Sequence, residues 1–361
     1  MNLKRKSVSI LLLATTLILF LGLAGAGFAV ADPNPGPPPV FPESSVVPAF
    51  PAAADLEPVA YLPLVLVPPE PLPWVDTQDR AAVQHYFLTE YQASEGIAPG
   101  WTGSHSGCTP GTTSAAFREA VLRRINYFRA MAGIPPVKGF DDTYNRLAQA
   151  AALMMSVNNA LNHTPPTNWL CYSQDGYDGA SSSNLYLGIY GPAAISGYMY
   201  DPGSGNTFVG HRRWILYPQT QQMGTGDVPP QNGYRAANAL WVFDANNIWG
   251  PRPVTREAFV AWPPPGYVPY QLVYPRWSFA YAGADFSGAW VTMTQNGQPV
   301  AVQVNPLANG YGENTLVWEP NGSFGGQSMS DVAVHVTIHN VSIDGQVHSF
   351  DYQVVVFDPA G

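Results

Sequence analysis

Four polar residues in the middle of the sequence have types that can carry chemistry: His163, Ser183, Asp201 and His211. Two neutral imidazoles that face one cleft can bind Zn²⁺ and leave coordination positions open for water or substrate. A serine, a histidine and an aspartate are also the set of a hydrolytic triad, but nothing near Ser183 indicates an activated hydroxyl. Each histidine also has a structural explanation, His163 beside helix-end carbonyl dipoles and His211 as a hydrogen-bonded residue that orders its loop.

The sequence motifs of several common enzyme classes are absent. The chain has no G-x-S-x-G with a central serine, no phosphate-binding loop and no H-E-x-x-H. His335 and His339 have the spacing of a helical metal pair, but their surroundings predict a strand, where four residues span about 13 Å. We therefore expect these two histidines on the solvent face of a sheet.

Helices must position the first candidate residues. Apolar residues at three- and four-residue spacing predict a helix over 114–132, which Gly133 and the following prolines end. A second helix, capped by Asp141 or Asp142, should run to about residue 161, close to His163. Shorter helices are expected over 79–93 and 192–200. Strand-like runs follow at 223–228 and 239–243.

After about residue 253 the pattern changes to short β-rich runs separated by turn residues, which is typical of an Ig-like β-sandwich. Asp344-Gly345, between the last two runs, predicts a tight hairpin. We expect a domain over 76–254 and a β-sandwich domain over 255–361, each with its own core. The seven runs lie near 257–262, 274–280, 288–295, 298–305, 314–319, 331–341 and 347–357.

The first residues have the layout of a secretory signal peptide over 1–31. Basic residues at 4–6 precede an apolar run, and Ala29-Val30-Ala31 offers a cleavage site before Asp32. The alternative is an uncleaved membrane anchor. Residues 32–75 are rich in proline and predict an extended linker. We expect a secreted, extracellular protein without a transmembrane segment after cleavage.

Charge and cysteine content restrict the partners and the redox environment. Only 11% of residues are charged and the net charge is −9, which argues against a nucleic-acid partner and against an anionic lipid surface. The chain has two cysteines, Cys108 and Cys171. In an exported protein they predict one disulfide, and the alternative is two unpaired thiols.

Five short segments recur in one order over roughly residues 112–245. Together they resemble the CAP superfamily, whose SCP-like domain is named for cysteine-rich secretory, antigen-five and pathogenesis-related proteins, and especially its bacterial secreted branch. The segments are N-x-x-R-x-x-x-G-x-x-P at 126–136, a helix followed by His163, Ser183-Asn184-Leu185, Tyr198 to Asp201, and Gly210-His211-Arg212 to Ile215-Leu216 with Gly224-Thr225-Gly226.

The resemblance implies a three-layer α-β-α sandwich with a cleft lined by two histidines and, in many members, two acidic residues. His163 and His211 match the two histidines. Ser183 stands where relatives have the glutamate of G-E-N-[IL], so that carboxylate is missing here. The second acidic position falls near Asp201, where an insertion over 202–209 loosens the match. Without the glutamate, no general base is evident unless Asp201 reaches the site.

From these observations we expect non-catalytic binding of a small apolar or glycan-like ligand in the two-histidine cleft. The glycan would be a cell-wall or extracellular one, and the cleft would also hold a divalent metal such as Zn²⁺ if the histidines are used as ligands. A metal-dependent hydrolase of peptide or glycan and a structural surface protein are the alternatives. We also expect Arg129 to bind a carboxylate or loop carbonyls. Four tryptophans are candidates for a groove wall, with core packing as the alternative for most of them: Trp169, Trp214, Trp241 and Trp249.

Overall fold

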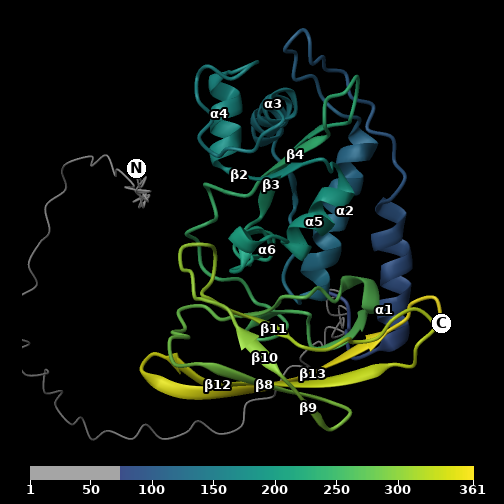
Figure 1. Ribbon diagram of the computed structural model, residues 1–361, viewed down its shortest axis with the longest axis vertical. Coiled ribbons are helices and arrows are strands. Elements are labelled where there is room, and N and C mark those ends of the chain that lie inside the picture. The colour runs from purple at the N-terminus through teal and green to yellow at the C-terminus, as the bar shows by residue number, and fades with distance from the viewer. Residues whose placement is uncertain (1–73) are drawn as a thin grey trace, which may run out of the picture. The chain divides into compact units, whose positions relative to one another are not determined.

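The computed structural model describes residues 74–361, which belong to one compact unit. The predicted signal peptide and nearly all of the predicted linker lie outside the described residues. Figure 1 shows the helices and strands from α1 to β13. None of the helices in the described part of the chain is long and apolar enough to cross a membrane.

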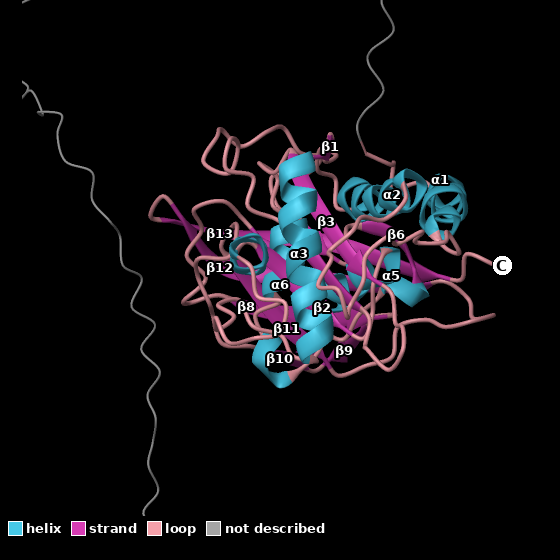
Figure 2. Cartoon of the chain, turned by 90° about the horizontal axis from the view of Figure 1, so that it is seen from above, coloured by secondary structure: helices cyan, strands magenta, loops and turns pink. Residues whose placement is uncertain are grey.

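The first half of the described chain is a three-layer α-β-α sandwich, as predicted. Its sheet has the order β1-β3-β4-β2, with β1 parallel to β3 and the other pairs antiparallel. One face packs against α3 and α4, and the other against α2 and α5; Figure 2 shows α3 lying over this sheet. The strands are β1 (Gly139–Phe140), β2 (Ser183–Leu187), β3 (Gln222–Val228) and β4 (Ala237–Trp241); the helices are α1 (Arg80–Tyr86), α2 (Ala115–Met131), α3 (Asp142–Asn158), α4 (Gln174–Ser181), α5 (Pro192–Tyr200) and α6 (Gly210–Ile215).

The helix ends follow from local hydrogen bonding. Ser114 caps α2 by accepting a hydrogen bond from the Phe117 amide, and Asp141 caps α3. Helix α3 stops at Asn158, earlier than predicted, because Asn159 adopts a left-handed conformation with φ of 48°. His163 therefore lies in the loop after α3 and not at the helix end. The predicted first helix continues from α1 through a π turn and a 3₁₀ turn to Ser94.

Gly224 and Gly226 of β3 have a packing role. A Cβ atom at Gly226 would lie 2.1 Å from the carbonyl carbon of Ala148, and one at Gly224 would lie 2.4 Å from the Cβ of Tyr144. Helix α3 thus lies directly on the backbone of β3. Two glycines at alternate positions of one strand face are what this close approach requires.

The second half of the described chain is all β and forms two packed sheets, as predicted. Their orders are β10-β11-β7-β5 and β6-β13-β12-β8-β9. Asp344 and Gly345 both have positive φ in the turn between β12 and β13, which confirms the hairpin. The strands are β5 (Val260–Trp262), β6 (Gly266–Pro269), β7 (Trp277–Ala280), β8 (Trp290–Gln295), β9 (Gln298–Val300), β10 (Val302–Val304), β11 (Thr315–Pro320), β12 (Val332–Ile343) and β13 (Gln346–Phe357).

Sequence pattern did not find strands β1, β2 and β6, and it did not separate β9 from β10. The run 298–305 is divided into β9 and β10, which pair in different sheets. Strand β6 follows a run of three prolines, whose missing amide donors argue against a strand. It is tolerated because β6 lies at the edge of its sheet and pairs only with β13.

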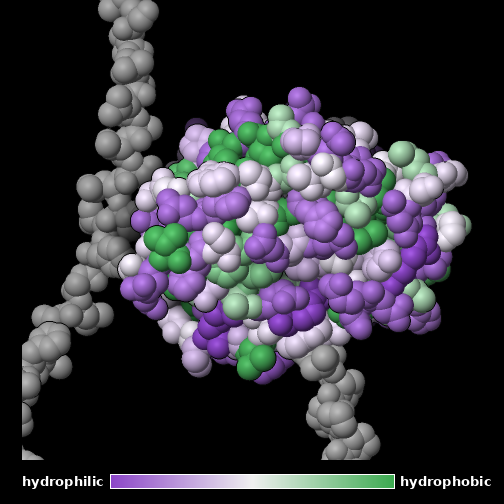
Figure 3. All heavy atoms as spheres, turned by 90° about the horizontal axis from the view of Figure 1, so that it is seen from below, coloured by the Kyte–Doolittle hydropathy of each residue, from purple (hydrophilic) through white to green (hydrophobic). Residues whose placement is uncertain are grey.

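Side chains along β12 alternate between buried and more exposed positions. Along β12, Val332, Val334, Val336 and Ile338 are buried, while His335 is exposed and His339 half-buried, as the alternation predicts. Seen from below, on the side where β12 and β8 lie in Figure 1, hydrophilic and hydrophobic residues are interspersed over the surface (Figure 3).

One hydrophobic cluster extends from α2 and α5 into the β-sandwich. It contains Phe128 of α2 and Trp262 of β5, whose ring centroids lie 5.2 Å apart. The predicted boundary near residue 254 is therefore crossed by buried contacts. Independent folding of 76–254 and 255–361 stays a prediction.

Candidate functional site

The structure brings three of the four candidate residues to one open cavity of about 340 Å³. His163, Ser183 and His211 lie on its polar side together with Asn184. Asp201 lies behind His211 and lines a neighbouring cavity. The other residues that line the first cavity are Ser181, Asn206, Phe208, Gly210, Trp214, Val242, Phe243, Gly310 and Tyr311. The cavity thus combines polar groups with an aromatic wall.

A buried carboxylate fixes the orientation of His211. Asp201 directly follows α5 in a left-handed conformation, and its side chain is inaccessible to solvent. Its Oδ1 lies 2.8 Å from His211 Nδ1, and its Oδ2 accepts a hydrogen bond from the His211 amide at 2.9 Å. A carboxylate accepts, so Nδ1 donates to it and Nε2 is the ring nitrogen left for other partners. Asp201 therefore reaches the site as the residue that orients His211.

His163 is held by one main-chain contact. Its Nδ1 lies 2.9 Å from the carbonyl oxygen of Ala180, at the end of α4. A carbonyl can only accept, so this histidine also carries its proton on Nδ1 and keeps Nε2 free. The two imidazoles therefore present the same type of nitrogen, although His163 is exposed and His211 is half-buried.

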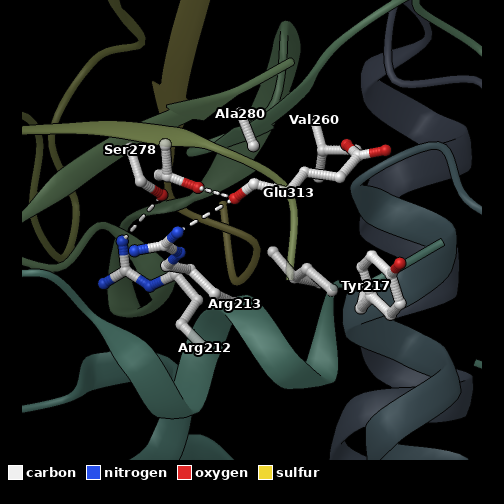
Figure 4. A pocket seen from close by; sticks show the side chains of 9 residues that line it. Arg212, Arg213, Tyr217, Val260, Ser278, Ala280 and Glu313 are labelled. Carbon is white, nitrogen blue, oxygen red and sulfur yellow. Dashed lines mark hydrogen bonds between the residues drawn. The ribbon is translucent and has the colours of Figure 1, made fainter. Parts of the chain in front are cut away.

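Two arginines anchor α6, the helix that carries His211, to the β-sandwich (Figure 4). Arg212 donates to Ser278 Oγ at 3.2 Å and to the carbonyl oxygen of Arg276 at 2.8 Å. Arg213 donates to the carbonyl oxygens of Ala308 and Glu313. The space between these groups is only about 20 Å³, room for about one water molecule. This region is a packed interface that fixes α6 against the β-sandwich.

Arg129 fixes the segment that follows α6. Its guanidinium is fully buried and donates to five backbone carbonyls: one in the loop after α2, at Pro135, and four in the segment from Ile215 to Thr220. This confirms the prediction of loop carbonyls as its partners. The arginine of the N-x-x-R segment thus holds the chain that leaves the G-H-R segment.

A buried network lies beneath His211 on the other side. Asp227 accepts from Asn238, and Tyr198 donates its hydroxyl to Asn238 Oδ1 at 2.7 Å and to the Asn184 carbonyl at 2.9 Å. Asn184 in turn donates to the His211 carbonyl at 3.1 Å. Burial raises the pKa of Tyr198 far above its usual range, so its hydroxyl stays protonated and donates. Burial also raises the pKa of Asp227.

The cavity offers fewer metal-binding atoms than a protein zinc site. Catalytic zinc has three protein ligands as a rule, whereas this cavity offers two imidazole nitrogens and the weakly coordinating hydroxyl of Ser183. Asp201 is directed to Nδ1 of His211 and supports that ring from behind. Among the described residues, no group of three or more His, Cys, Asp or Glu is placed to hold a metal. The donor set therefore falls short of the three protein ligands of a catalytic zinc site.

Ser183 does not have the surroundings of a nucleophile. Its Oγ is buried and has no hydrogen-bond partner among the described residues. A serine nucleophile needs a base within hydrogen-bond distance and an accessible oxygen. Neither imidazole makes that contact, so the arrangement lacks the central feature of a hydrolytic triad.

Sequence reasoning missed the part of the cavity wall that comes from the β-sandwich. Gly310 and Tyr311 lie about a hundred residues beyond His211 and carry no motif. Phe208 was missed as well, because it belongs to the segment inserted before Gly210. Trp214 does line the cavity, as one of the tryptophans suggested for a groove, whereas Trp249 is 90% exposed and lines neither cavity beside His211.

The predicted disulfide is present between Cys108 and Cys171. It joins the segment before α2 to the segment that follows the His163 loop. A covalent link therefore restrains the side of the cavity where His163 lies. The alternative of two unpaired thiols is excluded in this structure.

Comparison with protein families gives one match. Residues 122–245 match the model of the CAP family, described as the cysteine-rich secretory protein family. No curated protein matches the chain. The matched range contains Arg129, both cavity histidines, Ser183 and Asp201, and it coincides with the α-β-α sandwich. Residues 122–245 are therefore identified as a CAP domain, which a β-sandwich follows in the chain.

Proposed function

We propose that this is a secreted binding protein whose two-histidine cavity holds a glycan-like ligand without turning it over. The observation that carries the proposal is the composition of the cavity wall. Aromatic rings of Phe208, Trp214 and Tyr311 face the same space as the polar groups of His163 and His211. A sugar ring has apolar C–H faces and hydroxyl edges, and such a wall can contact both.

The histidines would serve this function through hydrogen bonds. In each ring Nδ1 is occupied, and Nε2 is left as an acceptor for a ligand hydroxyl. Divalent metal binding by the same two atoms is a further proposal, and acidification should weaken it because the imidazoles must be deprotonated. The signal-peptide pattern and the disulfide support export.

A test uses the full chain and calorimetry with the β-1,4-linked tetramer of N-acetylglucosamine. We expect Trp214→Ala to weaken binding at least about tenfold, equivalent to 1.4 kcal/mol, while Trp249→Ala stays within about twofold. No binding of this tetramer, with palmitate bound instead, would replace the glycan by the apolar ligand. Absence of both would favour the structural surface protein.

The metal-dependent hydrolase is the second candidate, and the Asp201–His211 pair favours it because an oriented imidazole is a good general base. The missing glutamate and the buried Ser183 hydroxyl argue for binding instead. Turnover of the tetramer that is lost in His211→Ala would replace the binding proposal. Calorimetry with Zn²⁺ tests the metal. Equal uptake by the wild type and the His163→Ala/His211→Ala variant would exclude these ligands.

A further inference from the structure

A second open cavity lies beside the first, and the two share residues. The second has a volume of about 280 Å³. His211 and Asn206 line both cavities. His211 thus lies at the junction of two spaces. Each alone is near the lower end of the roughly 300–1,000 Å³ of small-molecule pockets, while the two volumes together fall well inside that range.

The second cavity also has an aromatic wall. Tyr186 of β2 lines it and is half-buried, and its ring meets that of Tyr198 edge-on with centroids 5.6 Å apart. Leu161, 46% exposed, and Leu187 add apolar surface. A partly exposed aromatic ring therefore stands on this side of His211 as well.

The wall of the first cavity is completed by the β-sandwich. The loop between β10 and β11 carries Gly310 and Tyr311 into the cavity lining. The Tyr311 ring lies 4.6 Å from that of Phe208, between centroids, and the Arg213 guanidinium lies 5.7 Å from the Tyr311 centroid. Tyr311 remains 37% exposed, so part of its ring is open to a ligand.

This loop is fixed to the CAP domain on both sides of Tyr311. Arg213 donates to the carbonyl of Ala308 before it and to that of Glu313 after it, at 2.7 and 3.0 Å. Asn305 donates to the carbonyl of Thr207, at 3.0 Å. A loop held at three points offers its aromatic ring in a set position, which lowers the entropic cost of binding.

We propose that the joined cavities bind a linear oligosaccharide that crosses His211, with Tyr311 of the β-sandwich contacting one end and Tyr186 of the CAP domain the other. This rests on the proposed function and names its ligand as a chain of several sugar units. It also assigns the β-sandwich a ligand-contacting role through Tyr311. His211 Nε2, between the two cavities, would meet a hydroxyl near the middle of the bound segment.

The test measures affinity against chain length on the full protein. The probes are N-acetylglucosamine and its β-1,4-linked dimer, tetramer and hexamer. Affinity should rise at least tenfold from monomer to tetramer and change less than threefold from tetramer to hexamer. Tyr311→Ala and Tyr186→Ala should each weaken tetramer binding about tenfold or more, and the monomer should be affected by at most one of them. Tyr311→Phe should bind like the wild type, since the ring face makes the contact.

The controls separate this inference from the function on which it rests. Trp290→Ala removes a half-exposed aromatic residue that lines neither cavity and should leave every affinity unchanged. Equal affinity for monomer and tetramer would overturn the linear ligand while glycan binding stands. Unchanged tetramer binding in Tyr311→Ala would overturn the role of the β-sandwich. Absence of binding by all four probes would overturn the proposed function itself.

Discussion

The two histidines of the cavity are held in very different ways. His211 lies on a short helix that is anchored by Arg212 and Arg213 behind it, oriented by buried Asp201 and followed by the segment that Arg129 holds. His163 lies in an exposed loop and has one hydrogen bond, to a carbonyl of α4. One side of the cavity is thus preformed by buried polar contacts, whereas the other is restrained mainly by the disulfide.

The largest expected effect comes from breaking the His211 side at Arg129. Arg129→Met leaves several buried carbonyls without a donor, and we expect a loss of about 3–5 kcal/mol in the free energy of unfolding. Urea unfolding measures it. The control is Arg146→Met, which removes a half-exposed ion pair with Asp175 and should cost less than about 1 kcal/mol. Similar losses in both variants would contradict the assigned role of Arg129.

Removing the disulfide tests how the His163 side of the cavity is held in place. Replacing Cys108 and Cys171 by serine should lower the free energy of unfolding by about 2–5 kcal/mol. Without the cross-link, the unfolded chain has more conformational entropy, which favours unfolding. Hydrogen exchange should accelerate over 101–113 and 160–173 while α6 stays protected. Ser106→Ala, an exposed change in the same segment, is the control. Faster exchange in α6 to the same extent would remove the distinction between the two sides.

A smaller loss of stability is expected from a substitution that affects His211 and leaves His163 unchanged. Asp201→Ala removes two hydrogen bonds to His211, and we expect a loss of about 1–3 kcal/mol. Imidazole ¹⁵N shifts should show His211 losing its fixed Nδ1–H tautomer, with His163 unchanged as the internal reference. An unaltered His211 spectrum would mean that another group orients the ring.

The smallest effect is a pH dependence of the network beneath His211. Burial raises the folded-state pKa of Asp227 above its ordinary 3.8, so the folded chain keeps this proton to higher pH than the unfolded chain. Stability from this group is therefore greatest at acidic pH and falls as pH rises through the window between the two values. Asp227→Asn has no such titration. The free energy of unfolding of the wild type minus that of the variant, from urea unfolding, should decline as pH rises above the ordinary 3.8. A difference that stays constant with pH would contradict this.

Much of the fold could be predicted because its signals are local. Caps, apolar periodicity and the Asp344-Gly345 turn specify α2, α3 and the last hairpin from neighbouring residues alone. Strand β6 was missed because its pairing with β13 is long-range, and nothing within the proline-rich run reports it. The predicted end of α3 was too late because Asn159 adopts a left-handed conformation, which the spacing of apolar residues does not indicate.

The CAP domain, the disulfide partners and three of the residues that meet at the cavity could be identified from the sequence. It left the role of Asp201 open, and only the tertiary structure placed that carboxylate against Nδ1 of His211. Only the packing of the β-sandwich against the CAP domain places Tyr311 at the cavity. Its position depends on packing between two regions about a hundred residues apart. The hydrogen bonds that fix its loop to α6 join Arg213 to backbone carbonyls, which every residue type provides.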